Sequence, residues 1–521
     1  MAGRFNNTQG QSAALQVDSM AQADTVNRAG AKAFSKTAKM KLASLVLTSF
    51  LTDQSYRSGQ GAMDELAELS KEAGYEFAAK TALYGRHKFG MRSTSHVIAG
   101  EIASNVKKEQ WTKFFFDKVV RRVDDMSEIL GYLESKHGTI KPVPNSVKKG
   151  FKKAFNKFDD YQLAKYKMAG KDISLVDLVN LVHPEPVHLK NATSLEQLVN
   201  DELKNTKTWE AKVSKAGNSE DKEAAKTDAW RELLSEGKLG YLALLRNISN
   251  IVETNDTSLL NMLNSQLTNK VAVEKSLVMP HQIYTAYTQV QSRLSTMKAT
   301  DQDKLVESLD LAFIYSTGNI LLPEGETLVA LDTSGSMSGD TLTKGAVMAA
   351  AVAIGGKSDM MLFDTRAQYI NIVRRIPPMV AIESLINSRL GGGTDFGQVF
   401  RSAEKSYDNV VLISDGESWA HSWRCSPEQE RVNYTKRFNK KPAVFILDMT
   451  GYGTTQFPAD KVAETAGFTR ETLQTLGKLI SNPQALVDEI EAISLYPPKG
   501  KSLVKAYPRG TGINMEDLEN V

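Results

Sequence analysis

The sequence predicts a mainly α-helical chain that ends in an α/β domain, and two patterns along its 521 residues lead to this prediction. Across residues 31–316, apolar side chains recur at helical spacings of three and four, as in Leu245, Ile248 and Val252. Beyond Thr317, short β-prone runs alternate with helical stretches, which is typical of a mostly parallel sheet wound with helices. The length is sufficient for two or more domains of roughly 100–200 residues each.

The first part of the chain begins with a polar segment, residues 1–30, which we expect to be a flexible arm. Gly- and Pro-rich points such as Pro142-x-Pro144 and Met279-Pro280 then separate the helical segments. The clearest helices are expected at residues 39–51, 63–84, 96–105, 111–137, 174–182 and 303–315, and a solvated helix pair at 206–230. Because so many helices have to bury their apolar stripes against neighbours, we expect a bundle or a solenoid of helix pairs over residues 31–322.

The second part, residues 323–495, is expected to form the α/β domain. Its strands are predicted at residues 327–332, 360–364, 369–373, 410–414 and 444–448. Helices are predicted at 342–355, 380–389, 471–479 and 483–493. In such sheets the ligands bind at the carboxyl ends of the strands. The Pro- and Gly-containing residues 496–521 are expected to form an irregular tail.

The composition, 41% apolar and 24% charged, is that of an ordinary globular protein. No run of about 18 apolar residues could span a bilayer, and the first thirty residues lack the apolar core of a signal peptide. The single cysteine, Cys425, excludes an internal disulfide framework and fits a reducing compartment. We therefore expect a cytoplasmic, monomeric protein that makes no membrane contact.

The net charge of +3 hides an asymmetry between the two parts. Residues 1–322 contain 43 Lys and Arg against 37 Asp and Glu, whereas residues 323–521 contain 21 against 24. A surface that binds a polyanion is therefore expected in the helical part.

The motif with the most specific chemistry follows the strand predicted at residues 327–332. Asp332-x-Ser334-x-Ser336 places one carboxylate and two hydroxyls on alternating positions of a tight loop. Hard oxygen ligands of this kind suit Mg²⁺, which prefers a small octahedral shell and retains several waters.

Two further segments supply oxygen ligands in the same part of the chain. The glycine-rich run 391–395 carries Thr394, and the strand predicted at 410–414 ends in Asp415. This set resembles the metal-ion-dependent adhesion site of von Willebrand factor A domains. The resemblance implies direct contacts to a divalent cation from Ser334, Ser336 and Thr394, contacts through water from Asp332 and Asp415, and an acidic partner group that completes the shell. The alternative is a von Willebrand fold that has lost its metal.

The densest basic stretch, residues 148–171, contains eight lysines with Phe and Tyr residues between them. Lysines neutralise phosphates and aromatic rings stack on unpaired bases, so the stretch suits single-stranded nucleic acid. The alternative is an amphipathic helix whose aromatic side chains are core and whose lysines are solvated. The candidate RNA contacts on this stretch are Lys148, Lys149, Lys152, Lys153, Lys165 and Lys167.

Three separated motifs resemble the TROVE module of the Ro autoantigen family: ALYGRHKFGMRSTSHVIAGEIA at 82–103, QLAKYKMAGKDISLVDLVNLVHPEP at 162–186 and GYLALLRNISNI at 240–251. Members of this family also carry a C-terminal von Willebrand factor A domain. On this basis the chain is identified as a bacterial or phage-type member. The resemblance implies a ring of HEAT-like helical repeats closed by the von Willebrand domain. It also implies binding of misfolded small RNAs through single-stranded 3′ ends, and binding of Y-like RNAs.

By the same resemblance, Lys165, Lys167 and His183 match RNA-contacting positions. For His183 the alternative is a residue that caps the end of a helix. Arg86, Lys88 and Arg92 cluster near a glycine-containing turn and are secondary RNA candidates. The sequence departs from the family at Met168-Ala169, where an arginine is common.

The leading hypothesis is a non-catalytic RNA-binding ring that serves as a scaffold in RNA quality control or processing, with an exoribonuclease or another protein docked through the metal site. The alternative is a metal-dependent protein-interaction module that docks acidic partner residues, as in von Willebrand subunits of ATPase-driven complexes. An enzyme is the least favoured class, because the chain contains neither a P-loop nor a Gly-x-Ser-x-Gly elbow.

Overall fold

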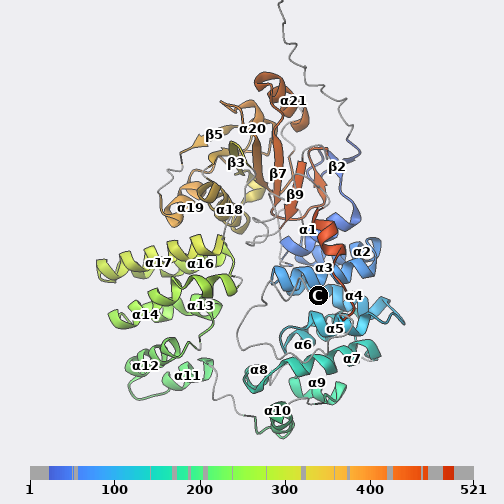
Figure 1. Ribbon diagram of the computed structural model, residues 1–521, viewed down its shortest axis with the longest axis vertical. Helices are drawn as coiled ribbons and strands as arrows, with labels where there is room; N and C mark the ends of the chain where they lie inside the picture. The colour runs from blue at the N-terminus through green and yellow to red at the C-terminus, as the bar shows by residue number, and fades with distance from the viewer. Residues whose placement is uncertain are drawn as a thin grey trace, which may run out of the picture.

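A computed structural model shows two arms of packed helices that both meet a sheet domain (Figure 1). The structure describes residues 23–49, 51, 57–140, 142–166, 173–185, 189–203, 209–237, 239–276, 278–317, 324–356, 358–371, 376–418, 426–458, 462–466 and 485–497. Within these ranges no helix is long and apolar enough to cross a membrane. The prediction of helical repeats followed by an α/β domain is confirmed.

The first arm contains the helices α1 Ala38–Thr48, α2 Gly59–Glu72, α3 Tyr75–Lys88, α4 Ser93–Asn105, α5 Thr112–Val119, α6 Asp125–His137, α7 Asn145–Ala154, α8 Asp160–Lys165, α9 Leu175–Val182 and α10 Leu189–Val199. Two helices predicted as continuous are divided. Gly74, with φ of 88°, separates α2 from α3, and a turn before Asp125 separates α5 from α6. The apolar spacing continues across both breaks because each pair of helices buries the same core.

The second arm contains the helices α11 Trp209–Ala216, α12 Lys222–Ser235, α13 Tyr241–Val252, α14 Thr257–Leu267, α15 Lys270–Lys275, α16 Pro280–Leu294 and α17 Ala299–Thr317. Several of these helices start at residues that favour a helix N-terminus. The Asp256 carboxylate accepts a hydrogen bond from the Leu259 amide at the start of α14, and Pro280 occupies the first position of α16. The predicted helix pair at 206–230 corresponds to α11 and α12.

The sheet domain is built on a six-stranded sheet with the order β5-β4-β3-β6-β7-β9. The strands are β3 Thr327–Asp332, β4 Asp359–Phe363, β5 Ala367–Ile370, β6 Asn409–Ser414, β7 Ala443–Asp448 and β9 Val462–Ala466. All are parallel to their neighbours except β5, which is antiparallel to β4. The helices are α18 Asp340–Gly356, α19 Pro378–Asn387, α20 Gly397–Arg401 and α21 Pro427–Phe438. The helix predicted at 471–479 lies outside the described residues.

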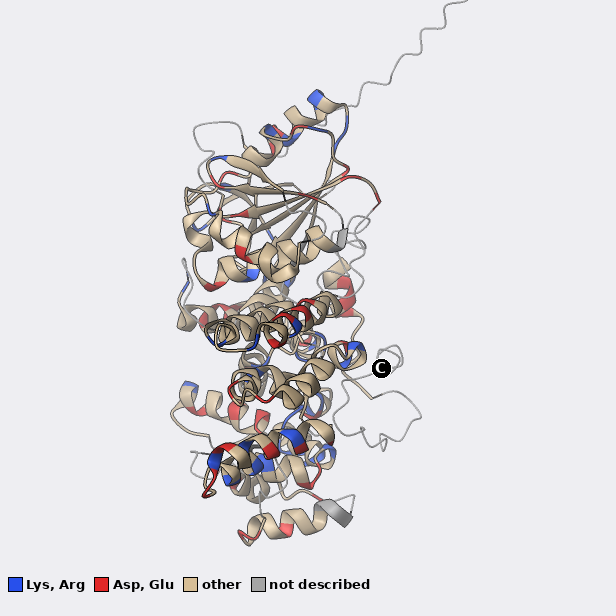
Figure 2. Ribbon diagram, turned by 90° about the vertical axis from the view of Figure 1, so that its left-hand side faces the viewer, with Lys and Arg blue, Asp and Glu red and all other residues tan. Residues whose placement is uncertain are grey.

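Alternate residues of the buried strands belong to two different cores. Val329 and Leu331 face α18 and α19, and this core continues into the second arm. Leu328 and Ala330 face α20 and α21. Figure 2 shows the strands largely without charged residues, as two buried faces require. The sheet and the second arm are therefore joined by one continuous apolar core.

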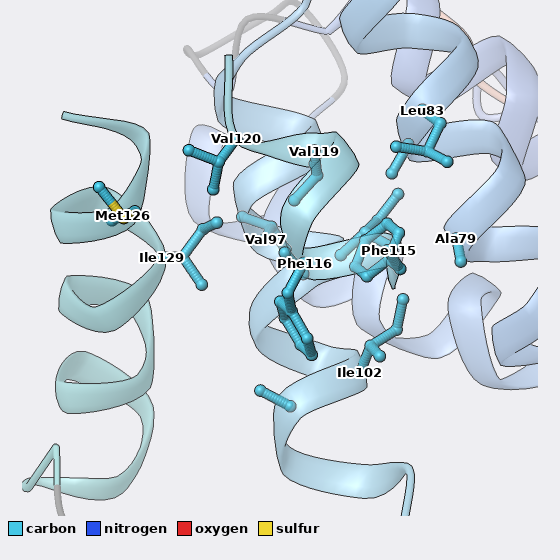
Figure 3. Packing of buried hydrophobic residues seen from close by; sticks show 14 of the residues in the cluster. Ala79, Leu83, Val97, Ile102, Phe115, Phe116, Val119, Val120, Met126 and Ile129 are labelled. Carbon is cyan, nitrogen blue, oxygen red and sulfur yellow. The ribbon is translucent and has the colours of Figure 1, made fainter. Parts of the chain in front are cut away.

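The first arm has its own apolar core, part of which Figure 3 shows at the crossing of α3, α4, α5 and α6. Phe115 and Phe116 are fully buried there, and their ring centroids lie 5.3 Å apart. Gly150 allows α7 to approach α5 closely, since a Cβ at this position would lie 2.4 Å from the Cβ of Phe116. The close contact places the basic helix α7 directly over α5.

The segments at both ends of the described chain pack against a different domain from the one expected from the sequence. Residues 23–30, expected in the flexible arm, contain β1 Thr25–Val26, which pairs with β2 Lys32–Ser35, and β2 pairs with β8 Thr454–Thr455 of the sheet domain. The buried ion pair between Lys36 and Asp448, 3.0 Å apart, fixes this segment. At the other end, α23 Ala485–Glu491 packs into the core of the first arm, although it was assigned to the sheet domain.

Candidate functional sites

Carboxylates lie at the ends of four neighbouring strands, at one edge of the sheet. Asp332 ends β3, Asp448 ends β7, and Asp364 and Asp415 directly follow β4 and β6. Because these strands are parallel, their carboxyl ends meet at the same edge. Asp448 is used by the ion pair with Lys36, so the centre of the edge is formed by the loops after β3 and β6.

The loop after β3 is organised around the Asp332 carboxylate. Its Oδ1 accepts a hydrogen bond from the Ser334 amide at 2.9 Å, and its Oδ2 accepts one from the Ser414 hydroxyl at 2.6 Å. The Ser334 and Ser336 hydroxyl oxygens lie 3.2 Å apart. Ser336 also hydrogen-bonds to the side chain of Asp415. Two of the predicted hydroxyl ligands are therefore adjacent, next to both predicted carboxylates.

The glycine-rich loop is attached to the same edge through its backbone. The Gly335 amide donates to the Gly392 carbonyl at 3.0 Å, and the Gly392 amide donates to Asp364 Oδ2 at 2.6 Å. The Ser418 hydroxyl donates to the Thr394 carbonyl at 3.3 Å. Asp364, for which the sequence indicated no role, thus fixes the loop that carries Thr394.

Three oxygens at this edge are buried and have no hydrogen-bond partner among the described residues: Thr394 Oγ1, Asp415 Oδ2 and Glu417 Oε1. An unsatisfied buried oxygen is costly, so this arrangement fits a bound cation. The electrostatics agree, because burial and the neighbouring Asp415 raise the pKa of Asp332, and burial raises the pKa of Asp415. The five predicted residues and Glu417 are the groups that could hold a metal.

Glu417 was not predicted as part of the site. Its Oε2 accepts a hydrogen bond from the Ala29 amide at 3.0 Å, and burial raises its pKa to about 7. Its position two residues after Asp415 was the available sequence signal. In the described part of the chain no group of three or more His, Cys, Asp and Glu side chains could hold a metal, so any cation here depends on the hydroxyls.

The aromatic side chains and the lysines of the basic stretch 148–171 lie in different surroundings, so each of the two interpretations, RNA-binding surface and amphipathic core helix, has to be considered for its own side chains. Phe151, Phe155 and Phe158 are buried core residues, as the amphipathic-helix alternative requires. Lys149 is exposed, and Lys148, Lys152 and Lys153 are half-buried along α7. Lys165 lies about equally far from two rings, with its Nζ 6.0 Å from the Tyr161 centroid and 5.9 Å from that of Tyr166.

His183 lies near this basic helix. It is exposed and ends α9 with φ of 47°, and its amide donates to the Val179 carbonyl at 2.9 Å. Lys152 pairs with Glu185, two residues further along, at 2.6 Å. The structure therefore brings His183 and α7 to one side of the arm, while Lys167 lies outside the described residues.

Arg86 and Arg92, predicted as secondary RNA contacts, form an ion cluster around the buried Asp125. Arg86 is 5% exposed and donates to Asp125 Oδ2 at 2.7 Å. Arg92 donates to Asp125 Oδ1 at 3.0 Å, and His96 Nε2 lies 3.1 Å from the same oxygen. Arg86 and Arg92 are therefore both held by Asp125, and their contact with RNA stays a prediction. Lys88 is half-buried at the end of α3.

Helical repeats followed by a C-terminal α/β sheet domain define the class of protein. The family model of the TROVE domain matches residues 31–205 and 200–312, and the chain belongs to this family. The RNA-binding protein RO60 of Deinococcus radiodurans is 24% identical over 233 residues, which cover 40% of this chain and 43% of the relative. The alignment thus spans less than half the length of that curated relative.

A solved structure gives a broader match. The crystal structure of the RO (RSR) protein of Deinococcus radiodurans has a TM-score of 0.55 with this chain at 18% identity. The match covers 86% of this chain and 100% of the other. Membership of the Ro family, expected from the sequence, is confirmed together with the fold class.

Proposed function

We propose that this protein binds small RNAs with single-stranded ends through the basic side of its first arm, without catalysing a reaction on them. The observation that carries the proposal is the row of lysines on α7, which the close α5–α7 contact holds on a rigid, aromatic core. Lysines fixed in this way neutralise successive phosphates, and His183 extends the same surface. The relative RO60, described as RNA-binding, supports this class of ligand.

In finer detail, we propose that the ligands include misfolded non-coding RNAs with a free 3′ end and Y-like RNAs, and that the protein is a cytoplasmic scaffold in RNA quality control. The test is a titration of purified protein with a stem that carries a 3′ tail, the same stem without the tail, and the corresponding DNA. Tighter binding of the tailed RNA, weakened by salt, is expected. Equal weak binding of all three contradicts the proposal.

A charge variant locates the surface. Replacing both Lys148 and Lys152 by alanine should lower the magnitude of the salt slope by roughly 2, since each lysine that contacts a phosphate contributes about 1. Lys222→Ala, on the second arm, is the matched control because Lys222 is an exposed lysine at the start of α12. An unchanged slope for the double variant would show that RNA lies elsewhere.

A second function is favoured by the three buried oxygens at the sheet edge for which the described part of the chain offers no hydrogen-bond partner. We propose that Ser334, Ser336 and Thr394 hold a divalent cation, most simply Mg²⁺, with Asp332 and Asp415 in support, and that an acidic side chain of a partner protein completes its shell. An exoribonuclease is one candidate for that partner. Loss of a co-purifying protein from Asp415→Ala, with RNA binding retained, is the expected outcome.

A further inference from the structure

The chain after α23 returns to the basic side of the first arm and is held there by its backbone. Lys118 Nζ donates to the carbonyls of Ser494 and Tyr496, at 2.9 and 3.3 Å. Leu495, between them, is 2% exposed and belongs to the core of the arm. The position of Tyr496 is therefore determined by the hydrogen bonds of Lys118 to the backbone and by the burial of the preceding residue, Leu495.

The Tyr496 ring packs beside Phe114 of α5. The two ring centroids lie 6.1 Å apart, with an angle of 58° between the planes. Tyr496 is 48% exposed and Phe114 is half-buried, so the pair presents an apolar surface to solvent. A large aromatic ring that is fixed in position yet half exposed loses little entropy when a flat ligand stacks on it.

Two lysines lie close to the Phe114 ring of this pair. Lys113 Nζ lies 4.8 Å from the Phe114 centroid, and Lys153 Nζ lies 5.8 Å from it. Lys113 is exposed. The Lys153 side chain is 41% exposed, and its Nζ forms an ion pair with Asp117 Oδ2 at 3.2 Å. Lys149 precedes Lys153 by one helical turn and is exposed. The surroundings of the two rings are thus predominantly cationic.

We infer that Phe114 and Tyr496 form a stacking platform for an unpaired base of single-stranded RNA, with the adjoining phosphates beside Lys113 and Lys153. This inference rests on the proposed RNA-binding function and identifies a contact for the unpaired end. Exposed aromatic rings bordered by lysines match a ligand that alternates flat bases with phosphates. The helical part and the segment after the sheet domain contribute one ring each, so the platform exists only in the full chain.

The test compares Tyr496→Ala with Tyr496→Phe, which retains the ring. The probe is a stem with a 3′ tail of about ten nucleotides, and the tail-free stem is the reference. Tyr496→Ala should weaken binding of the tailed RNA by roughly 5- to 30-fold, and Tyr496→Phe by less than about 2-fold. Neither variant should change binding of the tail-free stem.

Phe438→Ala is the matched control, because Phe438 is also a partly buried ring paired with a second ring, Tyr434, and a cation. Its centroid lies 4.8 Å from that of Tyr434, and the Arg437 Cζ lies 4.5 Å above it, on the sheet domain. RNA binding by this variant should equal that of the wild type.

The outcomes separate the platform from the proposed function. A wild-type protein that does not distinguish the tailed stem from the tail-free stem refutes both. A wild type that prefers the tail while Tyr496→Ala keeps full affinity refutes the platform alone. A tail containing 4-thiouridine should cross-link to the peptide of Phe114 or Tyr496, and cross-links confined to other peptides would also overturn the platform.

Discussion

Removing the Asp415 carboxylate should abolish the response of the protein to divalent cations. Asp415 is 1% exposed, its Oδ2 has no partner among the described residues, and it raises the pKa of the buried Asp332. In Asp415→Asn the repulsion between two buried carboxylates is absent. The metal-free variant should therefore be at least as stable as the metal-free wild type at pH 8.

The magnitude for the wild type follows from the unsatisfied atoms. Each of the three buried oxygens that lack a partner among the described residues costs about 1–3 kcal/mol, so a cation that satisfies one or two of them stabilises the fold by about 1–6 kcal/mol. Mass action gives about 2.7 kcal/mol when the free cation is at 100 times its Kd. For a domain of this size, that corresponds to a rise in Tm of roughly 5–10 °C.

Thermal unfolding with Mg²⁺, Mn²⁺ or EDTA at pH 8 measures this rise directly. The wild type should respond to the metals, whereas Asp415→Asn should not. Asp340→Asn is the control, since Asp340 is an exposed carboxylate in the first turn of α18, and it should respond like the wild type. A wild type without a response, or an equal response in Asp415→Asn, would refute the reasoning.

Three further predictions concern stability. Glu417 has an ordinary pKa of 4.5 and a folded pKa of about 7, so between these values it holds its proton more tightly in the folded protein. It should therefore contribute about 3 kcal/mol to the fall in the free energy of unfolding without metal as pH rises through this window, in addition to the fall from Asp332 and Asp415. Glu417→Gln should remove the Glu417 share of this loss in denaturant titrations at about pH 5 and pH 8. Asp125→Ala should cost about 3–5 kcal/mol because it strands buried cations, whereas exposed Glu128→Ala should change urea unfolding by less than about 0.5 kcal/mol. Gly150→Ala should cost about 1–3 kcal/mol by forcing α7 away from Phe116, and a calorimetric Tm equal to wild type would contradict that contact.

Strands β3, β4, β6 and β7 were predictable from the sequence because their information is local. Each of these strands is a short apolar run, and the loops that follow β3 and β6 carry their oxygen ligands within a few residues. Strand β9, Val462–Ala466, was not predicted, because its sequence VAETA is not such a run. The helical spacing of apolar residues predicted equally well that helices exist, but it predicted less well the residues at which they begin and end. Gly74 interrupts a continuous apolar stripe, and its positive φ is a property of the turn that the stripe does not encode.

The contacts that could not be predicted join residues far apart in the sequence. Arg86 carries the same charge as the lysines of α7, and only the position of Asp125, 39 residues later, makes it a buried structural cation. Phe114 and Tyr496 likewise become neighbours through the return of the chain after α23. Composition places the excess of positive charge in the helical part, but which of its cations reach solvent depends on these distant partners.

The pairing of the first strands with the sheet domain also sets an order of events during synthesis. Asn27 donates to the carbonyl of Ser418, 391 residues later, and β2 pairs with β8 at a similar separation. At about 5–20 residues per second, a ribosome needs roughly 20–80 s to deliver these partners after the first segment has emerged. The N-terminal segment is therefore without its partners in the sheet domain while the helices of the first arm are synthesised. Its docking onto the sheet domain can be completed only after Thr454 and Thr455 of β8 have been synthesised.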